Sequence, residues 1–180
     1  MKKPLVGIIM GSQSDLKIMG SAADILEQLG VPCEITILSA HRAPKRTAEY
    51  AESAIDRGLK VIIAAAGGAA HLGGVVAALT TLPVIGVPIK SANSMGGLDS
   101  LLSIVQMPEG VPVAAMATNG AVNAGVLAAQ IIATSDKAVA GRLVEYKKTL
   151  ENKVVASAKA LEIKGYKAII ALPAGQAGSQ

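Results

Sequence analysis

Short apolar segments alternate with amphipathic segments along most of this chain. The apolar segments have the length and β-branched content of buried strands, and they occupy residues 4–10, 32–38, 60–64, 83–88 and 111–117. Between them, apolar residues recur at helical spacing, and glycines mark several helix ends. The pattern predicts connecting helices over residues 15–29, 44–57, 72–81 and 98–107, followed by two helices over 120–134 and 136–158.

Strands that alternate with helices predict a parallel sheet covered by helices on both faces. We therefore expect an α/β protein with three layers, α/β/α, and the flavodoxin-like strand order 2-1-3-4-5. No linker, repeat or low-complexity tract interrupts the sequence, which predicts a single domain over residues 1–180. Its α/β core would span residues 1–158, and a C-terminal extension would span 159–180. Within the extension, AIIAL (168–172) is compatible with a strand or with a packing segment.

The composition restricts the classes of function. Hydrophobic residues make up 51% of the chain and charged residues 17%, which excludes a disordered protein and suggests that surface is buried between copies of the chain. The net charge of +4 is spread along the sequence, and Trp and Phe are absent. Nucleic-acid binding needs a clustered basic face and usually aromatic residues for stacking, so we expect a small anionic ligand instead.

The compartment is predicted from cysteine usage and from hydropathy. Cys33 is the single cysteine, so no disulfide can form within the chain, which indicates a reducing, cytoplasmic compartment. The N-terminal apolar run is better explained by the first strand than by a signal peptide. The stretch between Lys60 and Lys90 has no Asp, Glu, Lys or Arg, but glycines and prolines break it into pieces too short to span a membrane. Buried parallel strands produce the same hydropathy.

Ligands of such sheets bind beyond the carboxyl ends of the strands, where the strand order reverses. For the order 2-1-3-4-5, that point lies between the first and third strands, so the loops 11–15, 39–44 and 65–73 are the candidates. The first loop reads GSQSD. Ser12, Ser14 and the N–H groups of the next helix suit an anion, but the same residues with Asp15 also fit a capping box. Asp15 would repel a phosphate, and it better suits sugar hydroxyls.

The second loop reads SAHRAPKR, and it places basic residues at a helix N-terminus. Pro44 suits the first helical position. Cations are unfavourable at this positive end of the helix dipole, so an anionic ligand would stabilise the arrangement, with Arg42 as the phosphate-binding candidate. His41 is either a general acid/base or a structural histidine that bonds a carbonyl.

The third loop reads AAAGGAAHLGG, and its small residues allow the backbone to approach a flat ligand closely. His71 either binds the substrate or caps the next helix. The dinucleotide and Walker motifs are absent from the sequence. Two histidines without a carboxylate cluster argue against a catalytic metal.

The motifs GSQSD, SAHRAP, AGGAAHL, LDSLLSIVQMP and NAGVLAAQI occur in this order. Together they resemble the bacterial class I N5-carboxyaminoimidazole ribonucleotide mutases of de novo purine synthesis, over roughly residues 4–150. The resemblance implies transfer of a carboxylate from the exocyclic nitrogen to ring carbon 4, without metal, ATP or organic cofactor. It also implies a homo-octamer with sites near the subunit contacts, and it involves neither nucleic acid nor a membrane.

The resemblance also implies residue roles. His41 would be the general acid/base, Ser12, Ser39 and Arg42 would hold the phosphate, and Asp15 would hold the ribose. The residues implied to enclose the imidazole and its carboxylate are Gly67, Gly68, Ala69, Ala70, His71 and Leu72, and Ala40 is a further implied substrate contact.

Four features depart from the usual family pattern: Ala43 replaces threonine, Ala65 replaces a glycine, Gly73 replaces proline, and the loop over 90–99 is longer. Two alternatives to the mutase stay open. One is a class II-like carboxylase that joins free carbon dioxide to aminoimidazole ribonucleotide, although the arginine after His41 favours the mutase. The other is a flavodoxin-like nucleotide-binding module without chemistry. The absence of Trp and Phe argues against flavin binding by such a module.

Overall fold

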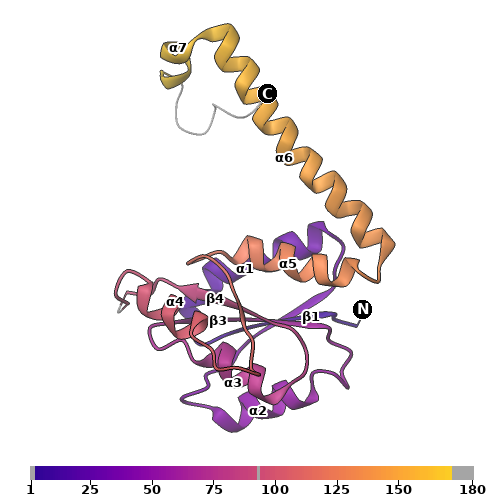
Figure 1. Cartoon of the computed structure of the whole chain (residues 1–180), viewed down its shortest axis with the longest axis vertical. Helices are drawn as coiled ribbons and strands as arrows, with labels where there is room; N and C mark the ends of the chain where they lie inside the picture. The colour runs from indigo at the N-terminus through magenta and orange to yellow at the C-terminus, as the bar shows by residue number, and fades with distance from the viewer. Residues whose placement is uncertain (1–2, 93, 172–180) are drawn as a thin grey trace. The chain divides into compact units, whose positions relative to one another are not determined.

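The computed structural model describes residues 3–92 and 94–171 (Figure 1). The chain divides into two compact units, Met1–Val139 and Ala140–Gln180. The first unit contains the sheet, and the second contains most of a long helix. The sequence-based expectation of a single domain stays a prediction.

The first unit is built on a five-stranded parallel sheet with the order β2-β1-β3-β4-β5, which confirms the predicted fold and strand order. The strands are β1 (Val6–Met10), β2 (Cys33–Ile37), β3 (Val61–Gly67), β4 (Val84–Ile89) and β5 (Ala114–Ala115). All residues of β1 and β4 are buried, as are those of β3 before Gly67, which explains their continuous apolar sequences. β2 is an edge strand, and its Ile35 and Ile37 are exposed.

Helices cover both faces of this sheet (Figure 1). The single-turn η1 (Gln13–Asp15) leads into α1 (Leu16–Gln28), which packs against α5 (Ala121–Ala133) on one face. The opposite face carries α2 (Pro44–Ser53), α3 (Leu72–Leu79) and α4 (Leu98–Val105). Aliphatic side chains fill this second layer, since its core contains Ile62, Leu72, Val76 and Ile104. Because the strands run parallel, β1 to β4 all end at the same edge of the sheet.

Most elements agree with their predicted ranges to within about two residues, whereas β5 and α2 are clearly shorter. β5 contains two residues, whereas the apolar run 111–117 suggested a full strand. β5 lies at the sheet edge, where Ala114 and Ala115 pair with β4. Pro112 cannot donate a ladder hydrogen bond, which limits pairing before Ala114. α2 ends at Ser53, and turns carry the chain to Gly58, whose φ of 97° requires glycine.

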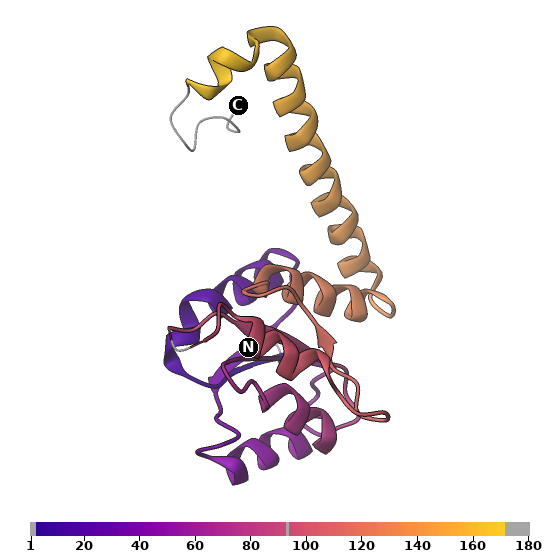
Figure 2. The same ribbon diagram turned by 60° about the vertical axis from the view of Figure 1, so that its left-hand side comes forward.

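The second unit is helical (Figure 2). α6 (Lys137–Lys164) continues six residues beyond the predicted end at 158, and Gly165, with a φ of 76°, separates it from α7 (Tyr166–Ile170). The first three residues of AIIAL therefore lie in a helix rather than in a strand, and Ala171 follows it as the C-cap. Residues 172–180 lie outside the described residues. Of the described helices, none combines the length and apolar composition that crossing a membrane requires.

Candidate active site

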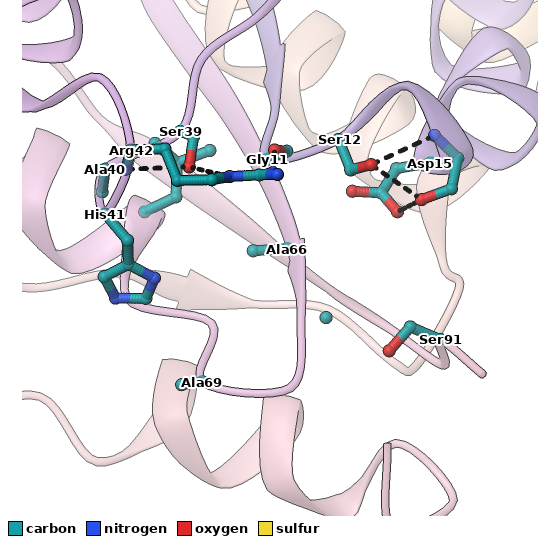
Figure 3. A pocket seen from close by; sticks show the side chains of 13 residues that line it. Gly11, Ser12, Asp15, Ser39, Ala40, His41, Arg42, Ala66, Ala69 and Ser91 are labelled. Atoms are coloured by element: carbon teal, nitrogen blue, oxygen red, sulfur yellow. Dashed lines mark hydrogen bonds between the residues drawn. The ribbon is translucent and has the colours of Figure 1, made fainter. Parts of the chain in front are cut away.

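Loops that follow four of the strands enclose a cavity of about 410 Å³ (Figure 3). The cavity lies at the carboxyl edge of the sheet, at the point between β1 and β3 where the strand order reverses. Its lining contains Gly11, Ser12, Ser14, Asp15, Ser39, Ala40, His41, Arg42, Ala66, Gly67, Ala69, Leu72 and Ser91. Nine of the twelve predicted site residues are in this lining; Gly68, Ala70 and His71 are not.

The loop after β1 is both a helix cap and a wall of the cavity. The Ser12 side chain accepts a hydrogen bond from Ser14 N at 3.4 Å, which fits the predicted cap. The Ser14 hydroxyl lies 3.1 Å from Ser12 Oγ and 3.1 Å from Asp15 Oδ1. Asp15 is 4% exposed, and this burial raises the pKa of its carboxyl, while hydrogen bonds to the Ser14 side chain and the Ser12 backbone oppose that rise. The carboxylate is thus positioned within the cavity wall.

Arg42 connects the loops after β1 and β2. Its backbone N and its Nε each donate to Ser39 Oγ at 3.3 Å, and its Nη2 donates to the Gly11 carbonyl at 3.1 Å. Arg42 remains exposed, so guanidinium donors are accessible to a ligand. The arginine, Ser39 and Ser12 all line the cavity, which makes this part of it a suitable site for a phosphate.

The two histidines of the chain contact each other. His41 Nε2 lies 3.0 Å from His71 Nδ1, and the rings meet edge to face with centroids 5.1 Å apart. One ring nitrogen must donate and the other accept, so the two tautomers are coupled. His71 is the N-cap residue of α3, but its side chain makes no cap hydrogen bond and its ring contacts His41 instead. The predicted contact of His71 with the substrate stays a prediction. The bond to His71 also replaces the carbonyl partner considered for a structural His41.

The loop after β3 forms a wall of small and apolar groups. Ala66, Gly67, Ala69 and Leu72 line the cavity, whereas Ala70 is buried beneath it. Gly68 adopts a φ of 62°, a conformation that favours glycine and turns the chain sharply at this point. This wall and His41 line the same cavity (Figure 3).

The residue roles predicted from the sequence do not include Gly11, Ser14, Ala66 or Ser91, although the first three lie in loops predicted to form the site. Ser91 follows β4, and the parallel order itself was the available signal, because the end of β4 lies beside the end of β3. Within the described residues, no three His, Cys, Asp or Glu side chains are grouped so that they could hold a metal ion.

Comparisons with known proteins identify related chains. The family model described as AIR carboxylase matches residues 5–153. The chain is 58% identical to the N5-carboxyaminoimidazole ribonucleotide mutase of Pyrococcus horikoshii over 165 residues, which cover 92% of this chain and 93% of that protein. It is 57% identical to the enzyme of the same name from Thermotoga maritima over 164 residues, which cover 91% of this chain and 95% of that one.

A solved structure is also similar to this chain, at lower sequence identity. The crystal structure of Treponema denticola PurE is similar with a TM-score of 0.78 and 30% sequence identity, covering 88% of this chain and 98% of that one. The family match over residues 5–153 includes the sheet and all of the loops that form the cavity.

Proposed function

Because this chain belongs to the AIR carboxylase family, we propose that it is an isomerase of purine biosynthesis that converts N5-carboxyaminoimidazole ribonucleotide to 4-carboxy-5-aminoimidazole ribonucleotide. The observation that carries the proposal is the cavity itself. It joins an exposed arginine, a buried carboxylate and a histidine beside a wall of Gly and Ala.

Binding of the nucleotide follows from the positions of these groups. The 5′-phosphate lies against Arg42, Ser39 and Ser12, where charge-assisted hydrogen bonds are strong. Asp15 accepts hydrogen bonds from ribose hydroxyls. These remote contacts hold the imidazole beside His41, so that binding energy from the phosphate and the sugar orients the reacting ring.

His41 moves the protons of the reaction. Protonated His41 donates its proton to the exocyclic nitrogen as the bond from that nitrogen to the carboxyl carbon breaks and carbon dioxide is released, which leaves the His41 ring neutral. Ring carbon 4 then attacks this carbon dioxide, and His41 accepts the proton displaced from that carbon, so the overall change is an isomerisation. His71 orients the His41 ring through the bond of 3.0 Å.

The wall formed by Ala66, Gly67, Ala69 and Leu72 retains the intermediate. Carbon dioxide has to remain beside the ring until carbon 4 attacks it, and water has to be kept away. Small apolar groups offer no hydrogen bonds to water, which favours both conditions.

The test is an assay of purified protein with N5-carboxyaminoimidazole ribonucleotide, in the absence of ATP and added metal, with labelled bicarbonate present. We expect 4-carboxy-5-aminoimidazole ribonucleotide to form with little label. A parallel assay with aminoimidazole ribonucleotide and bicarbonate tests the carboxylase reaction. Turnover in the second assay alone would show a carboxylase, and turnover in neither would contradict both reactions.

The family resemblance also supports a homo-octamer in the cytoplasm. Large apolar side chains are exposed on α6, among them Val144 (64%), Val154 (70%) and Ile163 (83%), and contacts between copies would bury them. The single cysteine and the biosynthetic activity support a cytoplasmic location.

A further inference from the structure

Ser91 is a polar residue of the cavity to which the reaction described above gives no role. It lies directly after β4, and its side chain faces the cavity from the side opposite His41 (Figure 3). Among the residues that the structure describes, its hydroxyl has no hydrogen-bond partner. A polar group in this position is available for a ligand.

Hydrogen bonds fix the backbone around Ser91. Ser100, which is fully buried, donates its hydroxyl to the Ile89 carbonyl at 3.1 Å. Asn119 Oδ1 accepts a hydrogen bond from Lys90 N at 3.0 Å. The Ser91 carbonyl accepts hydrogen bonds from Ser94 N at 3.1 Å and from the Ser94 hydroxyl at 2.8 Å. The position of Ser91 is therefore determined by its neighbours, while none of the described residues hydrogen-bonds to its hydroxyl.

Gly67 provides the space that Ser91 occupies. A Cβ at Gly67 would lie 2.9 Å from Ser91 Oγ and 3.0 Å from Ser91 Cβ, which is closer than real side chains approach. The ends of β3 and β4 are paired in register, Gly67 with Ile89, so this close approach is built into the sheet. The absence of a side chain at Gly67 therefore allows Ser91 to face the ligand.

A second cavity groups Ser91 with Asp15. This cavity, of about 340 Å³, is lined by Ser14, Asp15, Ile18, Ile89, Lys90, Ser91 and Ala92. Ser14, Asp15 and Ser91 line both cavities, whereas His41 and Arg42 line only the first. Ser91 thus lies with Asp15 in the corner of the site remote from the histidine and from the arginine.

We propose that Ser91 binds the ribose of the substrate directly, in hydrogen-bonding contact with one of the sugar hydroxyls beside Asp15. The inference rests on the proposed function. A ribose offers two adjacent hydroxyls, and an ionised carboxylate can only accept hydrogen bonds. A serine hydroxyl both donates and accepts, so Asp15 and Ser91 together satisfy a diol that Asp15 alone would leave incomplete.

The test combines Ser91→Ala with changes in the nucleotide. Binding of 5-aminoimidazole ribonucleotide, which has no carboxylate to transfer, is measured by calorimetry beside its 2′-deoxy and 3′-deoxy analogues. Ser91→Ala should weaken binding of the ribonucleotide by about 3- to 10-fold, the value of one neutral hydrogen bond. One of the two deoxy analogues should bind equally well to wild type and variant, because the group that Ser91 contacts is missing from it.

Ser103→Ala is the matched control, because its hydroxyl donates to the Asp99 carbonyl within α4 and lies outside both cavities. It should leave all three affinities unchanged. Turnover of N5-carboxyaminoimidazole ribonucleotide by Ser91→Ala should show a raised KM with kcat within about 2-fold of wild type, since the lost contact is remote from the reacting atoms.

Unchanged affinity for the ribonucleotide, or an equal loss of affinity for all three nucleotides, would overturn the role of Ser91 while active wild type still supported the mutase. A wild-type protein that neither binds the ribonucleotide nor turns over the substrate would overturn both the inference and the function on which it rests.

Discussion

His41 is the residue whose substitution separates chemistry from binding. His41→Asn keeps a polar side chain of similar size but cannot transfer protons near neutral pH. We expect kcat to fall by at least about 10²- to 10⁴-fold, the usual contribution of a general acid/base, while nucleotide affinity measured by calorimetry changes little. His71→Asn is the control, because His71 contacts His41 but does not line the cavity, and its effect should be smaller. Turnover by His41→Asn close to that of wild type would contradict the assignment.

The ionised carboxylate of Asp15, which is proposed to bind the ribose, should lower the free energy of unfolding of the protein without ligand. Its burial raises its pKa above the ordinary value of 3.8, so ionisation is less favourable in the folded chain than in the unfolded chain. The free energy of unfolding therefore falls as the pH rises from 3.8 through the folded-state pKa, and the loss is complete above that pKa. Asp15→Asn removes this loss, so its melting temperature should exceed that of wild type at pH 7.

The comparison is made by thermal unfolding across a pH series. The advantage of Asp15→Asn should shrink as the pH falls toward 3.8, while its affinity for the nucleotide should be weaker than that of wild type. Asp24→Asn, at an exposed position of α1, is the control and should change stability by no more than about 0.5 kcal/mol. A melting temperature for Asp15→Asn below that of wild type at pH 7 would show that the carboxylate stabilises the fold.

At the scale of elements, two helical glycines with different surroundings test whether the space around a glycine determines the effect of adding a Cβ. A Cβ at Gly73, in the first turn of α3, would meet Val113 Cγ1 at 3.6 Å and Ala64 Cβ at 3.8 Å, which are ordinary contacts. Gly73→Ala should therefore raise the free energy of unfolding by about 0.4–1 kcal/mol, chiefly because it restricts the unfolded chain. A urea titration measures the change.

Gly125 in α5 provides the contrasting case. A Cβ there would contact the Ile25 side chain and lie 2.9 Å from the Ala22 carbonyl, where α1 and α5 pack together. Gly125→Ala should lower the free energy of unfolding by about 1–3 kcal/mol, as expected of overpacking. If both substitutions changed stability in the same direction, the local space around each glycine would not be what determines the effect.

These elements also show what the sequence could predict. Hydrophobic periodicity located the buried strands and their connecting helices because each pattern reflects which face is buried, and parallel topology then placed three loops at one edge. The predicted length of β5 was too great, because an apolar run does not reveal that a proline at the sheet edge limits pairing. The AIIAL segment was ambiguous, because a short apolar run has no period long enough to distinguish a helix from a strand.

The site was predictable to the extent that topology alone determines it. His41, Arg42 and Asp15 lie in loops that the strand order brings together. The bond between His41 and His71 depends on ring orientations, which sequence spacing does not specify. Ser91 enters the cavity because Gly67 lacks a side chain, a relation between two neighbouring strands that neither loop shows alone.

The whole molecule is expected to be an assembly, and α6 offers a way to test it. Leu143, Leu150, Val154 and Leu161 recur at helical spacing on one side of this helix, and the last three are exposed by 45%, 70% and 46%. A single chain in water leaves this apolar surface uncovered, whereas contact with another copy would bury it. Light scattering of the wild type should give about eight times the chain mass of 18.1 kDa.

Val154→Lys places a charge within this apolar side of α6 and should shift the scattering mass toward smaller species, because a buried unpaired ammonium is costly. Asn152→Lys adds the same charge two residues away, on the opposite side of the helix, and should leave the mass unchanged. If both variants retained the wild-type mass, the apolar side of α6 would not be the contact between copies. If both variants had a lower mass than wild type, the added charge rather than its position would be the cause. Only a difference in mass between the two variants assigns the contact to this side of the helix.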